Sequence, residues 1–136
     1  MDVTFSKEDT DFQNEVKDWL EVNWPEDIRE KQNKSALQKL SKEDLVAWQK
    51  RLAEKGWAAP NWPVEYGGAG FTPNQNYIFD LERSKVGAPG VVPFGITMVA
   101  PVIMKFGNAS QKEQFLPKIL NSDIWFCQGY SEPGSG

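Results

Sequence analysis

The sequence predicts an all-α domain, a small bundle of five to six helices that ends in a single strand. Three observations predict this class. Apolar residues recur at helical spacing in several segments, and caps, prolines and glycines bound those segments. Forty per cent of the 136 residues are hydrophobic and six are tryptophans, which is enough to fill one core. We therefore expect a helical domain over residues 1–121, followed over residues 122–136 by the first strand and turn of a β-domain.

The first helix is predicted over residues 7–23. Ser6 can cap it, and Asp9 lies at the third helical position, where a carboxylate favours the helix dipole. Pro25 should end this helix and start a second, short one, and the polar residues 32–40 are expected to form a linker. Apolar residues share one face of the first helix: Phe12, Val16, Trp19 and Leu20.

A further long helix is predicted over residues 42–55. Ser41 can cap its N-terminus, with Asp44 at the third position, and Gly56 stands where a left-handed C-terminal cap belongs. Its apolar stripe consists of Leu45, Trp48 and Leu52. The tryptophans are interpreted as core residues, above all Trp19, Trp48 and Trp57.

The prolines and glycines of residues 57–70 exclude a regular helix, so we expect an ordered loop held by buried aromatic residues. Thr72 followed by Pro73 is a cap with proline in the first turn, and it predicts a helix that reaches about Val86. The inward residues of that helix are expected to be Tyr77, Ile78 and Leu81.

Residues 96–106 are apolar almost all round, which is typical of a buried helix. Pro101 should kink this helix or reset its first turn, because proline has no backbone N–H. Residues 110–113 match a capping box, so a last helix is predicted from Ser110 to about Leu120, bent at Pro117.

Composition excludes several classes of function. The net charge is −4 with acids and bases interleaved, which argues against nucleic-acid binding by phosphate neutralisation. No run approaches the roughly 20 apolar residues that span a bilayer, and we expect no membrane span. The chain has no histidine and one cysteine, so histidine-activated nucleophiles and a zinc site are excluded. Cys127 is expected to pack in the interior, and a single cysteine favours a cytoplasmic location.

The C-terminal segment carries the candidate site. An apolar, strand-like run over residues 124–130 leads into Ser131 and a glycine-rich turn. A lone strand is unstable without partners, so we expect its sheet to lie outside these 136 residues. Such a segment commonly places backbone amides against a flat, polar ligand, and glycine lets the backbone approach closely. An ordinary strand and turn is the alternative interpretation.

Several short motifs, in their order along the chain, resemble the N-terminal helical domain of acyl-CoA dehydrogenases. The closing motif is similar to the flavin-binding segment of that family. The resemblance covers nearly the whole chain, but the residues before Ser41 match only in helical character. The motifs are GWAAP at 56–60, WPVEYGG at 62–68, KFGN at 105–108, QK at 111–112, FLPKI at 115–119 and QGYSEPGSG at 128–136.

The resemblance implies a flavoenzyme with a helical domain, a β-domain and a C-terminal four-helix bundle. Such an enzyme uses FAD to oxidise an acyl-CoA thioester to trans-2-enoyl-CoA, and its glutamate base belongs in most members to the C-terminal bundle. We therefore expect no catalytic residue in this chain, a chain truncated at the flavin-binding turn, and no activity from it alone. The implied partners are electron-transfer flavoprotein and further copies in a homotetramer, less often a heteromer.

The resemblance also implies roles for individual residues. A flavin gains negative charge near N1 and the C2 oxygen on reduction, so donors fixed there favour hydride acceptance. The residues implied to contact FAD are Gln128, Gly129, Tyr130, Ser131 and Gly136. Those implied to form the acyl pocket are Phe94, Thr97 and Met98, for which plain core packing is the alternative. Glu65 and Glu132 are interpreted as structural carboxylates and not as bases.

Two alternative functions stay open. One is a relative in the same superfamily, an acyl-CoA oxidase or a flavin monooxygenase, in which oxygen takes the electrons. The other is a helical interaction domain that binds no flavin.

Overall fold

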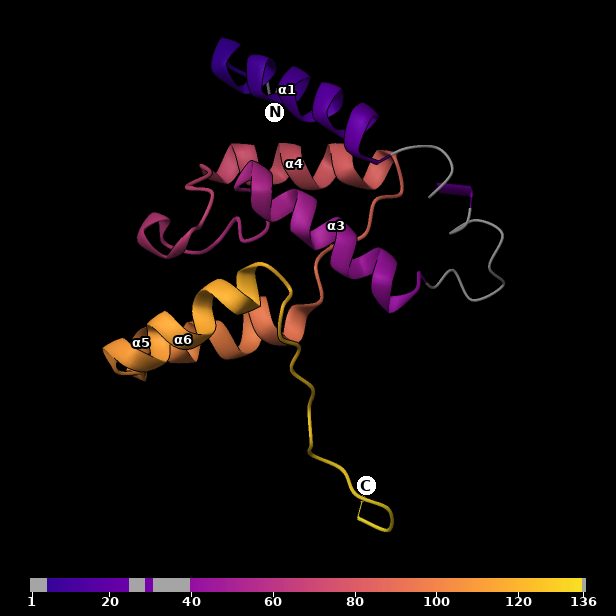
Figure 1. Cartoon of the computed structure of the whole chain (residues 1–136). Helices are drawn as coiled ribbons and strands as arrows, with labels where there is room; N and C mark the ends of the chain where they lie inside the picture. The colour runs from indigo at the N-terminus through magenta and orange to yellow at the C-terminus, as the bar shows by residue number, and fades with distance from the viewer. Residues whose placement is uncertain (1–4, 25–28, 31–39, 136) are drawn as a thin grey trace. The chain divides into compact units, whose positions relative to one another are not determined.

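The computed structural model describes residues 5–24, 29–30 and 40–135. Within these residues the chain is all-α with five α-helices, which confirms the predicted class (Figure 1). It also contains a 3-10 turn and a π-helical segment, which were not predicted. The short helix predicted after Pro25 and the linker predicted over residues 32–40 lie largely outside the described residues. The chain divides into two compact units, one from residues 1–44 and 70–90, the other from residues 45–69 and 91–136.

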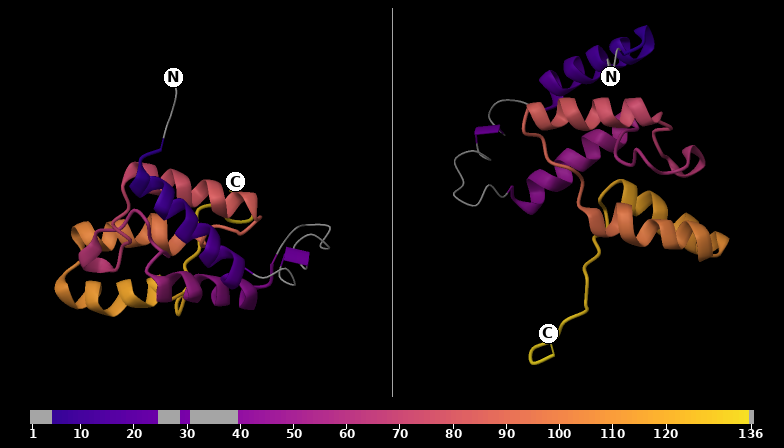
Figure 2. Two further views of the ribbon diagram at one scale, coloured as in Figure 1. Left: turned by 90° about the horizontal axis from the view of Figure 1, so that it is seen from above. Right: turned by 180° about the vertical axis from the view of Figure 1, so that it is seen from behind.

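The first unit is a pair of helices, α1 (Lys7–Asn23) and α4 (Pro73–Lys85). They run side by side in all the views (Figures 1 and 2). Each begins with a capping box, in which the hydroxyl of Ser6 or Thr72 accepts a hydrogen bond from the backbone three residues on. The predicted helix starts are confirmed. The buried apolar residues of this pair are Phe12, Val16, Leu20, Ile78 and Phe79.

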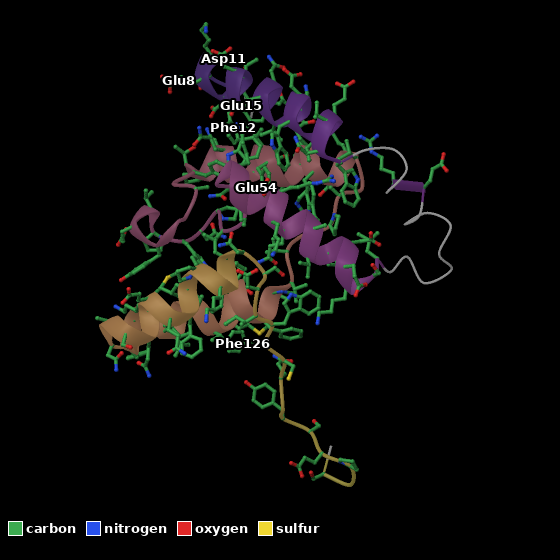
Figure 3. All side chains as sticks on the ribbon, in the orientation of Figure 1. Glu8, Asp11, Phe12, Glu15, Glu54 and Phe126 are labelled. Carbon is green, nitrogen blue, oxygen red and sulfur yellow. The ribbon has the colours of Figure 1, made fainter. Side chains whose placement is uncertain are left out.

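Three phenylalanine rings of the first unit contact one another. Phe12 of α1 meets Phe71 edge to face with ring centroids 5.0 Å apart, and Phe71 lies 5.8 Å from Phe79 of α4. Phe12 points from α1 toward α4 (Figure 3). The prediction that Tyr77 faces inward is wrong, because its side chain is 59% exposed. It lies about 100° around the helix from Ile78, on the flank that carries its ring toward Phe5.

Helix α3 (Lys42–Lys55) begins at the boundary of the two units, and most of it belongs to the second. The amide of Asp44 donates to the Ser41 hydroxyl at 3.1 Å, which confirms the predicted cap. At the other end Gly56 adopts φ +81°, and the N–H of Trp57 donates to the carbonyl of Leu52. This is the left-handed ending that the glycine predicts.

The loop after α3 is ordered, as predicted, and buried aromatic side chains hold it. It contains one turn of 3-10 helix, η1 (Val64–Tyr66). Gly68 is enclosed so closely that a Cβ atom there would lie 1.8 Å from the carbonyl oxygen of Trp62. Four of the six tryptophans are buried, namely Trp24, Trp48, Trp57 and Trp62, whereas Trp19 is half-buried and Trp125 is exposed.

The rest of the second unit consists of η2 (Phe94–Val99), a π-helix that continues directly into α5 (Ala100–Phe106), and of α6 (Ala109–Leu120). Helices α5 and α6 pack side by side (Figure 2). The core of this unit joins the loop to these helices through Ala59, Trp62, Ile96, Ala100, Leu116 and Ile119.

Two predictions about these helices are wrong. Helix α6 is capped by Asn108, whose Oδ1 accepts from the amide of Gln111 at 2.9 Å, so the cap lies two residues before Ser110. The helix formed by η2 and α5 is not buried all round. It exposes a stripe of three apolar side chains four residues apart, because the described part of its unit packs only against the opposite side. The stripe consists of Met98, Val102 and Phe106, which are 44%, 56% and 74% exposed.

The strand predicted over residues 124–130 is absent from the described part of the chain, where Ile124 lies in a bend and residues 125–130 form neither helix nor strand. A strand needs a neighbouring strand to satisfy its backbone hydrogen bonds, and the described elements are all helical. The predicted first strand of a β-domain is therefore a tail in this structure.

Candidate functional site

The C-terminal tail leaves α6 through a fixed turn. Ser122 adopts a left-handed conformation with φ +59°, and its amide donates to the carbonyl of Ile119. The Ser122 hydroxyl is buried and accepts from the indole Nε1 of Trp125 at 2.7 Å. This bond and the turn fix the direction in which the chain departs.

Phe126 of the tail packs against the apolar core of the second unit, and it lies at the base of the tail (Figure 3). Nearby, Gly95 of η2 leaves room for the side chain of Ile119. A Cβ atom at Gly95 would lie 3.0 Å from Ile119 and 3.7 Å from the Phe126 ring. A glycine inside an apolar helical pattern is a signal of close packing, but Gly95 was not among the expected site residues.

From Cys127 onward the tail is exposed. The expectation that Cys127 packs in the interior is wrong, because its thiol lies on the exposed extended segment. The residues implied to contact a flavin, Gln128, Gly129, Tyr130 and Ser131, are all exposed, with Tyr130 at 86%. Gly136 lies outside the described residues. Glu132 accepts a bond from the amide of Ser135 through its backbone carbonyl, which closes a turn at the end of the tail.

The residues implied to form the acyl pocket lie on the first turns of η2. Phe94 is half-buried, Thr97 is exposed and Met98 belongs to the exposed stripe. The Thr97 hydroxyl donates to the carbonyl of Pro93 at 2.8 Å, so its side chain is held against its own helix. Core packing therefore does not account for Thr97 or Met98.

The structure brings the two predicted segments together. The side-chain amide of Gln128 donates to the thioether sulfur of Met98 at 3.5 Å, although 30 residues separate them. A sulfur acceptor makes a weak hydrogen bond, so this contact orients the tail more than it stabilises it. One candidate cofactor residue and one candidate acyl-pocket residue thus lie on the same surface of the second unit.

An apolar pocket of about 320 Å³ lies beside this surface. Its walls come from the end of α5, the start of α6 and the base of the tail, and it shares Phe126 with the packing described above. The lining residues are Val102, Ile103, Phe106, Gly107, Gln111, Phe115 and Phe126. None of them was predicted as a site residue.

A second pocket, of about 270 Å³, is more polar. Glu65 lies at its rim with Tyr66 and Lys112, and the Lys112 ammonium donates to the Tyr66 hydroxyl at 3.3 Å. The side chain of Glu65 is exposed and distant in sequence from the tail. The interpretation of Glu65 as a structural carboxylate stays a prediction.

The described residues contain no group of three or more histidine, cysteine or acidic side chains that could hold a metal ion. No helix among them is both long enough and apolar enough to span a membrane.

Comparisons with known proteins identify relatives of this chain. The family model for the acyl-CoA dehydrogenase N-terminal domain matches residues 6–123. Acyl-CoA dehydrogenase IpdE1 of Mycolicibacterium smegmatis is 35% identical over 135 residues, which cover 93% of this chain and 33% of the relative. Acyl-CoA dehydrogenase FadE26 of Mycobacterium tuberculosis is 47% identical over 87 residues, which cover 63% of this chain and 21% of the relative.

Solved structures agree with the sequence matches. The chain superimposes on the ChsE4-ChsE5 complex from Mycobacterium tuberculosis with a TM-score of 0.74 and 32% identity, over 100% of this chain and 33% of that one. It superimposes on the Tcur3481-Tcur3483 steroid ACAD with a TM-score of 0.75 and 31% identity, over 100% of this chain and 34% of that one. The chain spans about a third of the length of the relatives that match it over most of its residues.

Proposed function

The chain belongs to the acyl-CoA dehydrogenase family, and we propose that it forms one wall of the acyl and flavin site of an FAD-dependent enzyme. That enzyme oxidises an acyl-CoA thioester to trans-2-enoyl-CoA. The observation that carries the proposal is the contact between Gln128 and Met98, which joins a candidate cofactor segment to a candidate acyl-pocket wall. The family match over residues 6–123 supports it.

The tail residues suit the edge of a flavin ring. Residues 128–131 are extended and exposed, so their backbone N–H groups and the Ser131 hydroxyl are available to an external acceptor. FAD, when bound, supplies the hydride acceptor of the reaction. We propose that the amides near Gln128 and Tyr130 and the hydroxyl of Ser131 donate to the pyrimidine edge of the ring. Fixed donors there stabilise the negative charge that arises on reduction.

The residues of η2 suit an acyl chain. Met98 is half-exposed beside the tail, and a thioether side chain adapts its shape to the group that it contacts. We propose that Thr97 and Met98 exclude water from the acyl chain and orient it. The glutamate that removes the α-proton is proposed to lie outside these 136 residues, so this chain alone should be inactive.

Two solved relatives suggest a narrower substrate class and a particular assembly. One is a steroid ACAD with two named components and the other is a ChsE4-ChsE5 complex. We propose that the acyl group attached to CoA carries a steroid-like ring system. We also propose a heteromeric assembly as a second candidate beside the predicted homotetramer. Electron-transfer flavoprotein stays the proposed electron acceptor.

A first experiment tests the reaction. The product of the full gene should purify with the yellow colour of bound flavin and should reduce an artificial dye without oxygen when acyl-CoA is added. A steroid-side-chain acyl-CoA should react faster than a straight-chain acyl-CoA. A colourless protein would favour the flavin-free interaction domain, and electron transfer to oxygen in place of dye would favour the oxidase.

A second experiment tests the role of Ser131. Ser131→Ala in the flavin-containing enzyme should lower the reduction potential of the flavin, because one donor to the reduced ring is lost. Ser110→Ala, on an exposed position of α6 outside the closing motif, is the matched control and should leave the potential unchanged. Equal potentials in wild type and Ser131→Ala would exclude this role. The 136-residue chain alone should not bind FAD with micromolar affinity.

A further inference from the structure

The π-helical register of η2 leaves one backbone carbonyl without a donor from its own helix. The amide of Ala100 donates to the carbonyl of Gly95, five residues earlier, which is the π-helical pattern. In this register the next donor, to the carbonyl of Ile96, would be the amide of residue 101. Residue 101 is proline and has no N–H. In an α-helical register the amide of Ala100 would donate to the carbonyl of Ile96, but here that amide already donates to the carbonyl of Gly95.

The indole of Trp62 supplies the missing donor. Its Nε1 donates to the carbonyl of Ile96 at 2.8 Å, across 34 residues of sequence. Both residues are buried, with 5% and 4% of their surface exposed, so water cannot take the place of this bond. Trp62 and Ile96 also belong to the same apolar cluster as Ala100, which places the ring against the helix at this turn.

A change of register at this turn would redirect the site residues. A π turn contains one residue more than an α turn, so its loss rotates the preceding residues by about 100° relative to α5. Thr97 and Met98 lie within the π segment, one and two residues after Ile96. Their present direction therefore depends on the register that the Trp62 bond stabilises.

We propose that Trp62 is a positioning residue, which holds the π turn of η2 and thereby sets the direction of Thr97 and Met98 in the acyl-pocket wall. The acyl-pocket role of Thr97 and Met98 rests on the proposed function, whereas the hydrogen bond and the π register are features of the structure itself. Trp62 itself is buried, so the proposed role acts through Thr97 and Met98.

A double-mutant cycle on the 136-residue chain tests the bond. Trp62→Phe keeps an aromatic ring and removes the indole N–H, and Pro101→Ala restores a backbone N–H that can donate to Ile96. Trp62→Phe should lower the urea midpoint by about 0.5–1 M in the native background. In the Pro101→Ala background, Trp62→Phe should lower the urea midpoint by less than about half of its effect in the native background.

Controls separate the bond from simple loss of volume. Trp57→Phe removes an indole from another buried position of the same loop, and its cost should be the same in the native and the Pro101→Ala backgrounds. If Trp62→Phe alone fails to fold, Pro101→Ala must restore folding in the double variant. Equal costs of Trp62→Phe in both backgrounds, or failure of that rescue, would overturn the inference.

The enzyme from the full gene tests the consequence for the pocket. Trp62→Phe should retain its flavin absorption and raise KM for acyl-CoA several-fold with little change in kcat, since binding of the acyl chain is weakened uniformly. Trp57→Phe should leave KM unchanged. An unchanged KM in Trp62→Phe would overturn the positioning role while the proposed function stands. A wild-type protein without flavin or turnover would refute the proposed function, and the urea cycle would still decide the role of Trp62 in the turn.

Discussion

The α1 and α4 unit buries an apolar stripe of each of its two helices, whereas the second unit leaves an apolar stripe of the η2 and α5 helix exposed. Leu20 of α1 is 1% exposed and Ile78 of α4 is fully buried, but Phe106 of α5 is 74% exposed. The two units also differ in their polar residues. The first unit buries two carboxylates, Asp9 and Glu82, and each of them accepts hydrogen bonds from neighbours within the unit.

The difference shows that apolar composition does not by itself reveal which surface a helix buries. Helix α5 is more apolar than α1, yet only one side of α5 packs into the core of the described chain. The exposed side instead lies on the surface where Gln128 meets Met98. Stability and the candidate function therefore use different sides of the same helix, and this division can be tested by substitution.

The largest expected effect compares two apolar truncations. Leu20→Ala should lower the free energy of unfolding by about 3 kcal/mol, because it removes a buried side chain and leaves a cavity. Phe106→Ala removes a larger side chain, but its cost should stay below about 0.5 kcal/mol because the ring is already in water. Urea unfolding followed by circular dichroism measures both. Similar losses of unfolding free energy in the two variants would show that the stripe of Met98, Val102 and Phe106 is covered in solution. The two units would then not differ in how they bury their apolar side chains.

A smaller effect concerns the buried carboxylate of α4. Burial acts to raise the pKa of Glu82, but hydrogen bonds from Lys85 and Gln13 and the charges of Lys85 and Lys17 outweigh it and lower the pKa below the usual 4.5. A lowered folded pKa means that this stabilisation is complete above the ordinary pKa. It is lost as the pH falls through the folded value, where the carboxylate takes up a proton.

Glu82→Gln should therefore cost about 2 kcal/mol at neutral pH and reduce the loss of stability on acidification. Urea midpoints measured from pH 6 down to pH 3 test both expectations. Glu54→Gln, on an exposed position of α3, controls for the loss of one negative charge. If Glu82→Gln lost as much stability on acidification as the wild type, other carboxylates would dominate the pH dependence of the free energy of unfolding. Asp9 would then be the next group to replace, because hydrogen bonds from Ser6 and Asn74 lower its pKa despite the opposing effect of burial.

The smallest expected effect is the loss of a helix N-cap, and it should be equal in the two units. Ser6→Ala at α1 and Asn108→Ala at α6 each remove a side-chain cap, and each should cost about 1 kcal/mol. Glycine at the same positions should cost only a few tenths of a kcal/mol, since it tolerates the cap conformation. Thermal unfolding of the four variants gives the comparison. A much larger cost in one unit would show that its cap also supports tertiary contacts.

Local signals in the sequence predicted most of the fold. The cap at Ser6, the left-handed ending at Gly56 and the start at Thr72 each depend on residues within one turn, so the sequence contains all that decides them. The family resemblance was confirmed as well, because it rests on motifs spread along the chain. The cap of the last helix was misplaced because Asn108 with Gln111 and Ser110 with Glu113 both fit a capping box.

Features that depend on distant residues were not predictable in this way. Periodicity places Tyr77 beside Ile78 but does not tell which flank another element covers. The strand over residues 124–130 has the right composition, yet a strand exists only when a partner pairs with it. The π register of η2 was also missed, although the effect of Pro101 on this helix was expected, because the bond from Trp62 crosses the chain.

In the candidate site, too, the single residues could be predicted from local motifs, but the contacts between distant residues could not. Motifs indicated Gln128 and Met98 separately, but their contact could not be predicted because they are 30 positions apart in the sequence. The role of Gly95 was not predictable from the sequence, because it depends on the space that the distant Ile119 side chain occupies. The roles of these residues toward flavin and acyl chain stay predictions.

The enclosure of Gly68 bears on how variants of this protein are interpreted. Any side chain at this position would overlap the backbone of Trp62 and Pro63, where no rotamer change can relieve the collision. A saturation screen for activity would therefore find that position 68 tolerates substitution as poorly as a catalytic residue does. Its intolerance would come from steric crowding in the loop and not from a role in the chemistry. Measuring protein abundance beside activity in such a screen would separate the two kinds of intolerance.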